Sequence, residues 1–115
     1  MLEDLLRNAG HKVMTAASAV EALVLIRMYK FDLILLDITM DGFDGHQLAH
    51  SLSVGWETFD IPIFVISARN DPTSKSWAKL HGCKRYIEKP FSPVDLLDAI
   101  DDHVRRNPAE VALSG

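Results

Sequence analysis

The stretch from Phe31 to Gly45, FDLILLDITMDGFDG, constrains the fold of this chain more than any other. It begins with four consecutive apolar residues, Leu33 to Leu36, and such a run is typical of a strand covered on both faces. The run stops at Asp37, and the turn-forming residues Asp41, Gly42, Asp44 and Gly45 follow. Ligands of open α/β sheets bind outside the carboxyl ends of the strands. Asp37 is therefore either placed for chemistry or a simple cap of the strand end, and the neighbouring strand ends decide between the two.

Helical and strand-like patterns alternate along the whole chain. We expect strands over His11–Ala16, 31–37, Ile61–Ser67 and Lys84–Glu88, and helices over 2–9, 18–30, 44–54, 71–82 and 92–104. Alternating elements of these lengths predict an α/β fold, in which a parallel sheet carries helices on both faces. The stretch from Asn107 onward has little periodicity. We therefore expect one domain over 1–106 and a frayed tail over 107–115.

Composition excludes several classes of protein. A chain of 115 residues is the size of one domain, and 48% apolar residues suffice for a core. The net charge of −4 and the lack of a Lys/Arg stripe argue against a nucleic-acid partner. No apolar run is long enough to span a membrane, and we expect no membrane partner. The single cysteine, Cys83, cannot form an internal disulfide and fits a reducing cytoplasm.

Three strand ends carry groups that fit one another chemically. The strands end at Asp37, at Ser67 and at Lys89, and in a parallel sheet these ends lie at the same edge. A carboxylate can accept a phosphoryl group and form an acyl phosphate. An ammonium would neutralise phosphoryl oxygens, and a hydroxyl would donate a hydrogen bond to one of them. The three ends together predict a phosphoryl-transfer site.

The motifs around these residues resemble the receiver domain of two-component response regulators. The resemblance is carried by Asp37 with the following ITMDGFDG, by VISA at 65–68 and by YIEKPF at 86–91. It implies a flavodoxin-like fold and a signalling module rather than an enzyme. It also implies phosphoryl transfer to Asp37 from a histidine kinase or phosphotransfer protein, with Mg²⁺ as the cofactor.

The resemblance also assigns roles to single residues. Asp37 matches the phosphoacceptor, and Ser67 and Lys89 match the hydroxyl and the lysine that bind phosphate. Tyr86 matches the aromatic switch that turns inward when the hydroxyl engages phosphate. Pro90 matches the proline that often follows a cis peptide bond in the family.

Two departures from the family pattern concern the metal site and its loop. Asp41 stands where the family usually carries proline, and it adds negative charge near the site. Receivers begin with an apolar strand that ends in an acidic pair, and that pair helps to hold Mg²⁺. Here only Met1 precedes the first helix. Asp37 and the backbone carbonyl of Thr39 are then the family-type metal ligands that remain, so we expect Mg²⁺ to bind weakly or not at all.

The absent strand also affects stability, because the family places it in the sheet interior between the His11–Ala16 strand and the Asp37 strand. Losing about five buried apolar side chains removes roughly 8–15 kcal/mol of burial. A whole domain is stable by only about 5–15 kcal/mol. We expect a second copy to complete or rearrange the sheet, which gives a two-fold homodimer. The alternatives are that the His11–Ala16 strand slides over to pair with the Asp37 strand, and that the chain is a fragment.

Three hypotheses for function follow. The first is a receiver module with Asp37 as the phosphoacceptor position, impaired in Mg²⁺-dependent phosphorylation and acting through protein contacts. The second is a fully competent, stand-alone phosphoaccepting regulator, whose site a partner or an upstream segment completes. The third is a small flavodoxin-like enzyme, for which the sequence offers no phosphate-binding glycine loop.

Overall fold

The computed structural model describes residues 2–17, 19–37, 61–67, 75–76, 79–80, 83–104 and 109–114. Within them, five strands form one sheet in the order β1-β5-β2-β3-β4, and all four pairings are parallel. The strands are β1 (Lys12–Ala16), β2 (Leu33–Asp37), β3 (Ile63–Ser67), β4 (Arg85–Glu88) and β5 (Glu110–Ser114). The helices are α1 (Leu2–Asn8), α2 (Ala19–Met28) and α5 (Pro93–His103). The helices predicted over 44–54 and 71–82 fall wholly or largely outside the described residues.

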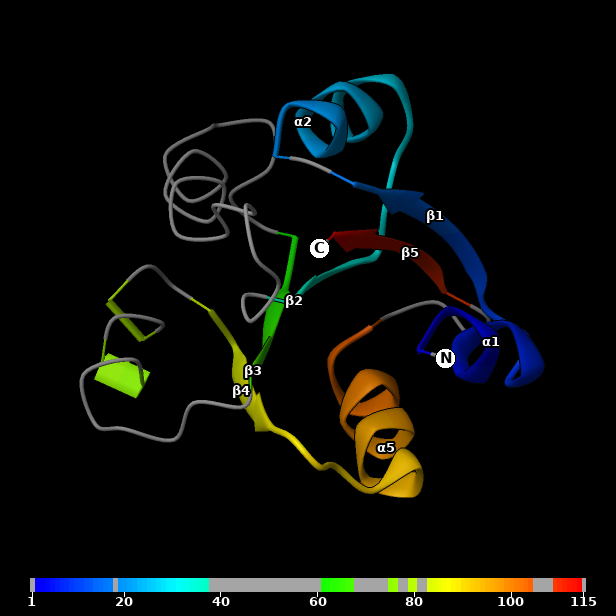
Figure 1. The fold of residues 1–115 in the computed structure, drawn as a ribbon. Helices are drawn as coiled ribbons and strands as arrows, with labels where there is room; N and C mark the ends of the chain where they lie inside the picture. Colours follow the sequence, from blue (N-terminus) through cyan, green and yellow to red (C-terminus); the bar gives the residue numbers. More distant parts are fainter. Residues whose placement is uncertain are drawn as a thin grey trace.

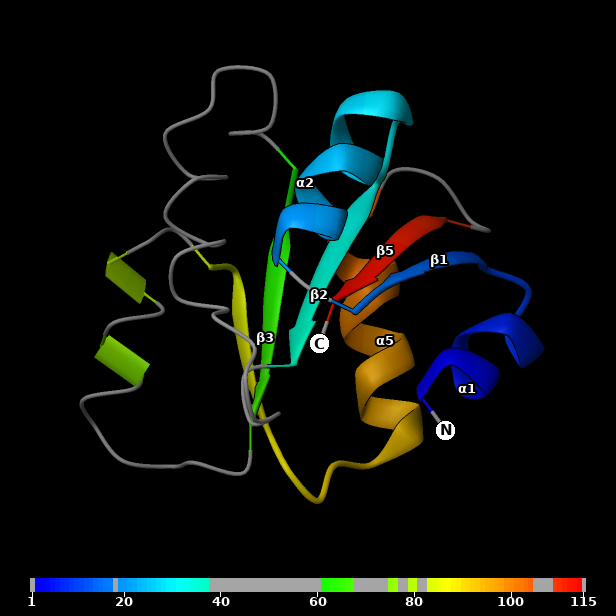
Figure 2. The same cartoon turned by 45° about the horizontal axis from the view of Figure 1, so that its top comes forward.

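Helices cover both faces of the sheet. Figures 1 and 2 show α2 against one face, and α1 and α5 against the other. The hydrophobic core has two parts that match these layers. One includes Leu6 of α1 with Leu96 and Ile100 of α5, and the other includes Ala22 and Ile26 of α2. The predicted α/β class, with a flavodoxin-like parallel sheet between helices, is confirmed.

Local sequence signals fix several helix ends. Gly10, with a φ of 95°, follows α1 at the predicted stop, in a conformation that favours glycine. Ser92 is the N-cap of α5 and accepts a hydrogen bond from the Asp95 N–H, and Pro93 is the first helical residue. Glu21 accepts a hydrogen bond from the Ala17 N–H at 3.4 Å, whereas a capping box would direct this bond to the N–H of Ser18. The N-cap predicted at Ser18 lies outside the described residues.

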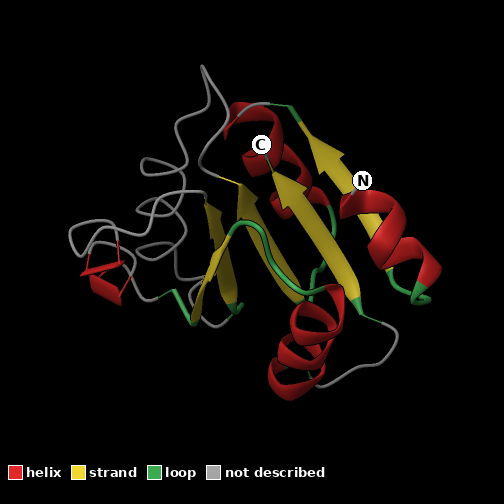
Figure 3. Ribbon diagram, turned by 60° about the horizontal axis from the view of Figure 1, so that its bottom comes forward, coloured by secondary structure: helices red, strands yellow, loops and turns green. Residues whose placement is uncertain are grey.

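β5 occupies the interior of the sheet, between β1 and β2, as Figure 3 shows. Its register runs from Lys12 opposite Glu110 to Ala16 opposite Ser114. The expectation of a frayed tail over 107–115 is therefore wrong for Glu110–Ser114. The physical reason is burial, since Val111 is 0% exposed and Ala112 is 4% exposed. An interior strand can be this short because both of its edges are paired.

Hydrogen bonds from both sides hold the start of β5. On the β1 side, the Ala109 N–H donates to Nδ1 of buried His11 at 2.9 Å, and the Lys12 N–H donates to the Ala109 carbonyl at 3.0 Å. On the β2 side, the Glu110 N–H donates to Oδ2 of Asp32 at 2.8 Å. The Asp32 N–H in turn donates to the Glu110 carbonyl at 2.8 Å. These hydrogen bonds fix the register of β5 relative to β1 and β2.

The position expected to be empty is thus filled by a segment of the same chain. The alternative in which the His11–Ala16 strand slides over to the Asp37 strand is wrong, because β1 pairs with β5 and β2 pairs with β5 and β3. The folded unit also extends beyond the predicted boundary at 106, because β5 is part of the sheet. Because β5 of the same chain fills this position, a second copy is not needed to complete the sheet, and the homodimer stays a prediction.

Candidate functional site

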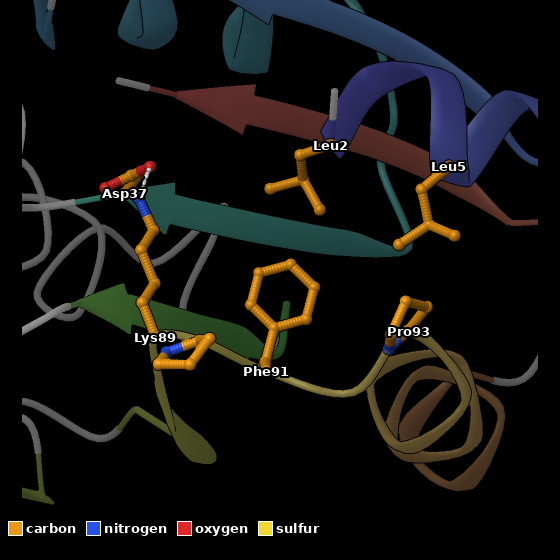
Figure 4. A pocket seen from close by; sticks show the side chains of 7 residues that line it. Leu2, Leu5, Asp37, Lys89, Phe91 and Pro93 are labelled. Carbon is orange, nitrogen blue, oxygen red and sulfur yellow. Dashed lines mark hydrogen bonds and ion pairs between the residues drawn. The ribbon is translucent and has the colours of Figure 1, made fainter.

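An ion pair marks the carboxyl end of the sheet. Nζ of Lys89 lies 2.6 Å from Oδ2 of Asp37, although the two residues are 52 positions apart. Figure 4 shows the lysine side chain reaching across the strand ends to the carboxylate. The side chain of Asp37 is 15% exposed and that of Lys89 is 34% exposed. A charge-assisted hydrogen bond of this length in a partly buried setting is stronger than a surface ion pair.

The strand between these two residues positions the lysine. β3 lies between β2 and β4, and its Ile66 is the register partner of Asp37. Ser67, the next residue, is fully buried, and its carbonyl accepts a hydrogen bond from the Lys89 N–H at 2.8 Å. Because this bond extends the β3–β4 pairing by one step, the Lys89 side chain starts next to the end of β3. The three predicted strand ends therefore meet at one edge, with Ser67 between the charged partners.

The other predicted site residues are placed less closely around the pair. Tyr86 is half-buried in the edge strand β4, opposite Val65. The peptide bond between Lys89 and Pro90 is cis. Thr39 and Asp41 lie outside the described residues.

A pocket of about 770 Å³ adjoins the ion pair. Its polar end is formed by Asp37 and Lys89, and Figure 4 shows the apolar side chains from α1, from the β4–α5 connection and from the start of α5 that form its wall. These apolar residues are Leu2, Leu5, Pro90, Phe91 and Pro93. Apart from Pro90, none of these residues was predicted from the sequence to belong to the site. Phe91 could have been found from the sequence, because it follows Lys89 and Pro90 directly in the motif KPF.

The donor set among the described residues does not fit Mg²⁺. This ion prefers near-octahedral oxygen ligands, with carboxylates among them. No group of three or more His, Cys, Asp or Glu side chains that could hold a metal is found in the described ranges. β5 ends beside Asp37, with Ser114 opposite Leu36, and residues 111–114 contain no carboxylate side chain. Glu88, next to Lys89, forms an ion pair with Lys75, and this contact raises the pKa of Lys75.

A bilayer-spanning helix is not found, since the longest helix in the described part of the chain, α5, has 11 residues.

Comparison with known proteins identifies the family. The family model of the response regulator receiver domain matches residues 1–101. Protein PilH of Pseudomonas aeruginosa is 33% identical over 100 residues, which are 87% of this chain and 83% of PilH. The transcriptional regulatory protein YvrH of Bacillus subtilis is 35% identical over 107 residues, which are 92% of this chain but 44% of YvrH. The chain thus spans less than half of that longer relative.

Solved structures agree with the sequence matches. A putative response regulator from Chloroflexus aurantiacus has a TM-score of 0.83 and 33% identity, covering 92% of this chain and 87% of that one. The chemotaxis protein CheY4 of Vibrio cholerae has a TM-score of 0.82 and 28% identity, covering 90% and 87%. With the parallel sheet and the Asp37–Lys89 pair at its carboxyl edge, these matches show that the chain belongs to the receiver domain family of two-component response regulators.

Proposed function

We propose that this receiver module uses Asp37 as its phosphoacceptor position, that its Mg²⁺-dependent phosphorylation is impaired, and that it signals through protein contacts. The observation that carries the proposal is the 2.6 Å contact between the Asp37 carboxylate and the Lys89 ammonium at the carboxyl end of β2. Receiver domains are signalling modules that interact with histidine kinases and phosphotransfer proteins. A protein of one of these two classes is the proposed phosphodonor partner, and the cytoplasm is the proposed location.

The proposed chemistry is transfer of a phosphoryl group between two side chains. A carboxylate oxygen of Asp37 attacks the phosphorus of a phosphohistidine, and an O–P bond forms while the N–P bond breaks. The departing imidazole takes up a proton. The Lys89 ammonium, already beside the carboxylate, neutralises charge on the phosphoryl oxygens. The Ser67 hydroxyl is proposed to donate a hydrogen bond to one of these oxygens, and Tyr86 to respond to that contact.

We infer the impairment from the charges of the described residues at the site. Receiver domains typically bind Mg²⁺ in the active site. Here the described carboxyl edge offers Asp37 alone, and its Oδ2 is held by Lys89. A phosphoryl group that approaches Asp37 therefore meets one cation where the family normally supplies a second. We expect transfer to Asp37 to be slow.

The pocket favours signalling through protein contacts. Its wall is apolar on two sides, from Leu2 and Leu5 of α1 and from Phe91 and Pro93 before and at the start of α5. A partner helix that brings apolar side chains onto this wall would place its own reactive or regulatory group beside Asp37. Apolar contacts of this kind do not depend on a metal ion.

The test is a phosphorylation assay read by intact-protein mass spectrometry. The chain is incubated with acetyl phosphate and millimolar Mg²⁺, with Asp37→Asn as the matched control and a well-behaved receiver domain as the positive control. We expect only a small fraction of the protein to gain the mass of one phosphoryl group. This labelled fraction should be absent in Asp37→Asn.

The other outcomes are equally informative. Stoichiometric, Asp37-dependent labelling would support the competent regulator and overturn the impairment. Labelling that persists in Asp37→Asn would overturn the assignment of the phosphoacceptor.

A further inference from the structure

β1 and β2 flank the position of β5 in the sheet, and we call this position the β5 slot. It consists of β1 and β2 together with His11 and Asp32, which precede these strands. In this structure the slot holds the segment 109–114 of its own chain. We propose that the same segment of a second copy also occupies it, in reciprocal exchange, so that two chains form a two-fold dimer. This inference concerns assembly and does not depend on phosphorylation.

The slot binds its occupant through parallel strand pairing on both sides and through apolar contacts on two faces. Ala109 and Val111 belong to the core part that includes Leu33 and Leu35 of β2. Ala112 belongs to the other part, with Ile34 and Leu36. β5 thus contributes side chains to both parts of the core while it lies between β1 and β2. An identical segment from another chain makes the same contacts.

Polar anchors select the register of the occupant. Nδ1 of His11 accepts a hydrogen bond from the backbone N–H of Ala109. Oδ2 of Asp32 accepts one from the next N–H along the chain, that of Glu110. Lys12 and Glu110 add an ion pair of 3.6 Å between side chains that are 76% and 30% exposed. Side chains from both walls thus recognise the start of an extended segment, which is the mode of binding called strand addition.

The order of the elements makes the slot available to other copies. Asp32 and Glu110 are 78 residues apart, and His11 and Ala109 are 98 residues apart. The ribosome therefore synthesises β1 and β2 long before it synthesises the segment that lies between them. Until then, both walls of the slot present strand edges that can pair with another chain.

The short connection limits the geometry of exchange. Four residues separate Val104, just after α5, from Ala109. Five Cα–Cα steps span at most about 18 Å. The α5 end of each copy must therefore lie within that distance of the partner's slot, so the two-fold axis passes close to the entrance of the slot at His11. A short connection also gives the chain's own segment an effective concentration in the millimolar range. The closed monomer thus dominates at micromolar concentration, and exchange grows as the chain is refolded at higher concentration.

A disulfide trap distinguishes the two states. The variant carries Lys12→Cys and Glu110→Cys, at register partners whose native side chains form an ion pair, together with Cys83→Ser. Oxidation links a closed monomer within one chain, whereas it links two chains in an exchanged dimer. The variant is refolded from urea at about 1 µM, far below the effective concentration, and at about 1 mM, comparable with it. The two single-cysteine variants are the matched controls.

The expected result is a within-chain disulfide at the low concentration. At the high concentration we expect at least a tenfold larger fraction of covalent dimer, in which peptide mapping shows the introduced thiol at position 12 of one copy bonded to that at position 110 of the other. A dimer on gel filtration whose chains are each closed by their own disulfide would overturn the proposal. Only monomers at both concentrations would overturn it as well.

A complementation pair gives a second readout that does not use disulfides. Val111→Asp damages the segment, and Leu35→Asp damages the slot; both native residues are fully buried. Each variant alone should refold poorly. Refolded together, they can form one intact unit from the sound slot and the sound segment, so circular dichroism should recover about half of the wild-type signal. A mixture that shows only the sum of the two separate spectra contradicts exchange.

Discussion

At the level of single residues, the Asp37–Lys89 pair is predicted to couple energetically. Lys89→Met removes the ammonium from a carboxylate that is 15% exposed, and we expect a loss of about 1–2 kcal/mol in the free energy of unfolding. In an Asp37→Asn background the same change should cost less, because no charge is left behind. Urea unfolding of the four members of this double-mutant cycle measures the coupling. Equal costs in both backgrounds would show that the contact contributes nothing.

His11 is predicted to act through the acceptor at Nδ1. His11→Phe leaves the buried Ala109 N–H without this acceptor and should cost about 1–3 kcal/mol. His11→Asn keeps an oxygen near the same position and should cost less. Chemical denaturation compares the two variants, and a larger cost for Asn than for Phe would rule out the hydrogen bond as the reason.

Cys83 is predicted to react slowly. Burial raises the pKa of its thiol from 9.0 to about 11. The thiolate fraction at pH 8 is then about a hundredfold lower than in the unfolded chain, and the thiolate is the reactive form. The rate of labelling by a thiol reagent at pH 8, with and without urea, checks this, and equal rates would contradict it. Because the unfolded thiol ionises first, stability from this group is intact below pH 9 and declines between pH 9 and about pH 11.

At the level of elements, β5 is predicted to be essential to the sheet. Val111→Asp places an unpaired charge in the sheet interior and should cost more than about 4 kcal/mol, enough to unfold most of the chain. Val20→Asp, at a residue of α2 that is 72% exposed, should change stability by less than about 0.5 kcal/mol. Thermal melts of the two variants give the comparison. Similar melting temperatures would mean that β5 is not part of the folded core.

The elements also show what the sequence could predict. The apolar run before Asp37 and the strand ends at Ser67 and Lys89 were enough to predict the parallel sheet and its charged edge. β5 was missed because its five residues include Ala, Ser and Glu, which have low strand propensity, and because they closely follow Pro108. β5 could have been predicted only from the arrangement of the whole sheet. The family position between two predicted strands needed an occupant, and the apolar run at 111–113 was left unassigned.

The apolar pocket wall was missed for a related reason. Leu2 and Leu5 follow a helical pattern that only predicts burial, and nothing local connects them with Asp37. Their contact with the site depends on how α1 packs beside the β4–α5 connection. Such tertiary placement cannot be derived from periodicity within one segment.

At the level of the whole molecule, the chain builds a receiver sheet in an unusual order. The strand beside β2, which ends at Asp37, comes from the last described element, and it forms parallel pairs with strands 78 to 98 residues earlier. Such non-local pairing is expected to slow folding, because a long loop must close before the contacts form. The carboxyl edge at Asp37 therefore belongs to a sheet that the segment Glu110–Ser114 completes.

Amide hydrogen exchange tests this central claim most directly. The N–H groups of Val111, Ala112 and Leu113 should exchange as slowly as those of Leu33 to Leu36, because both strands lie inside the sheet and open only when the sheet unfolds. Exchange of residues 111–113 at the rate of an unstructured peptide, while β2 remains protected, would show that β5 does not complete the sheet.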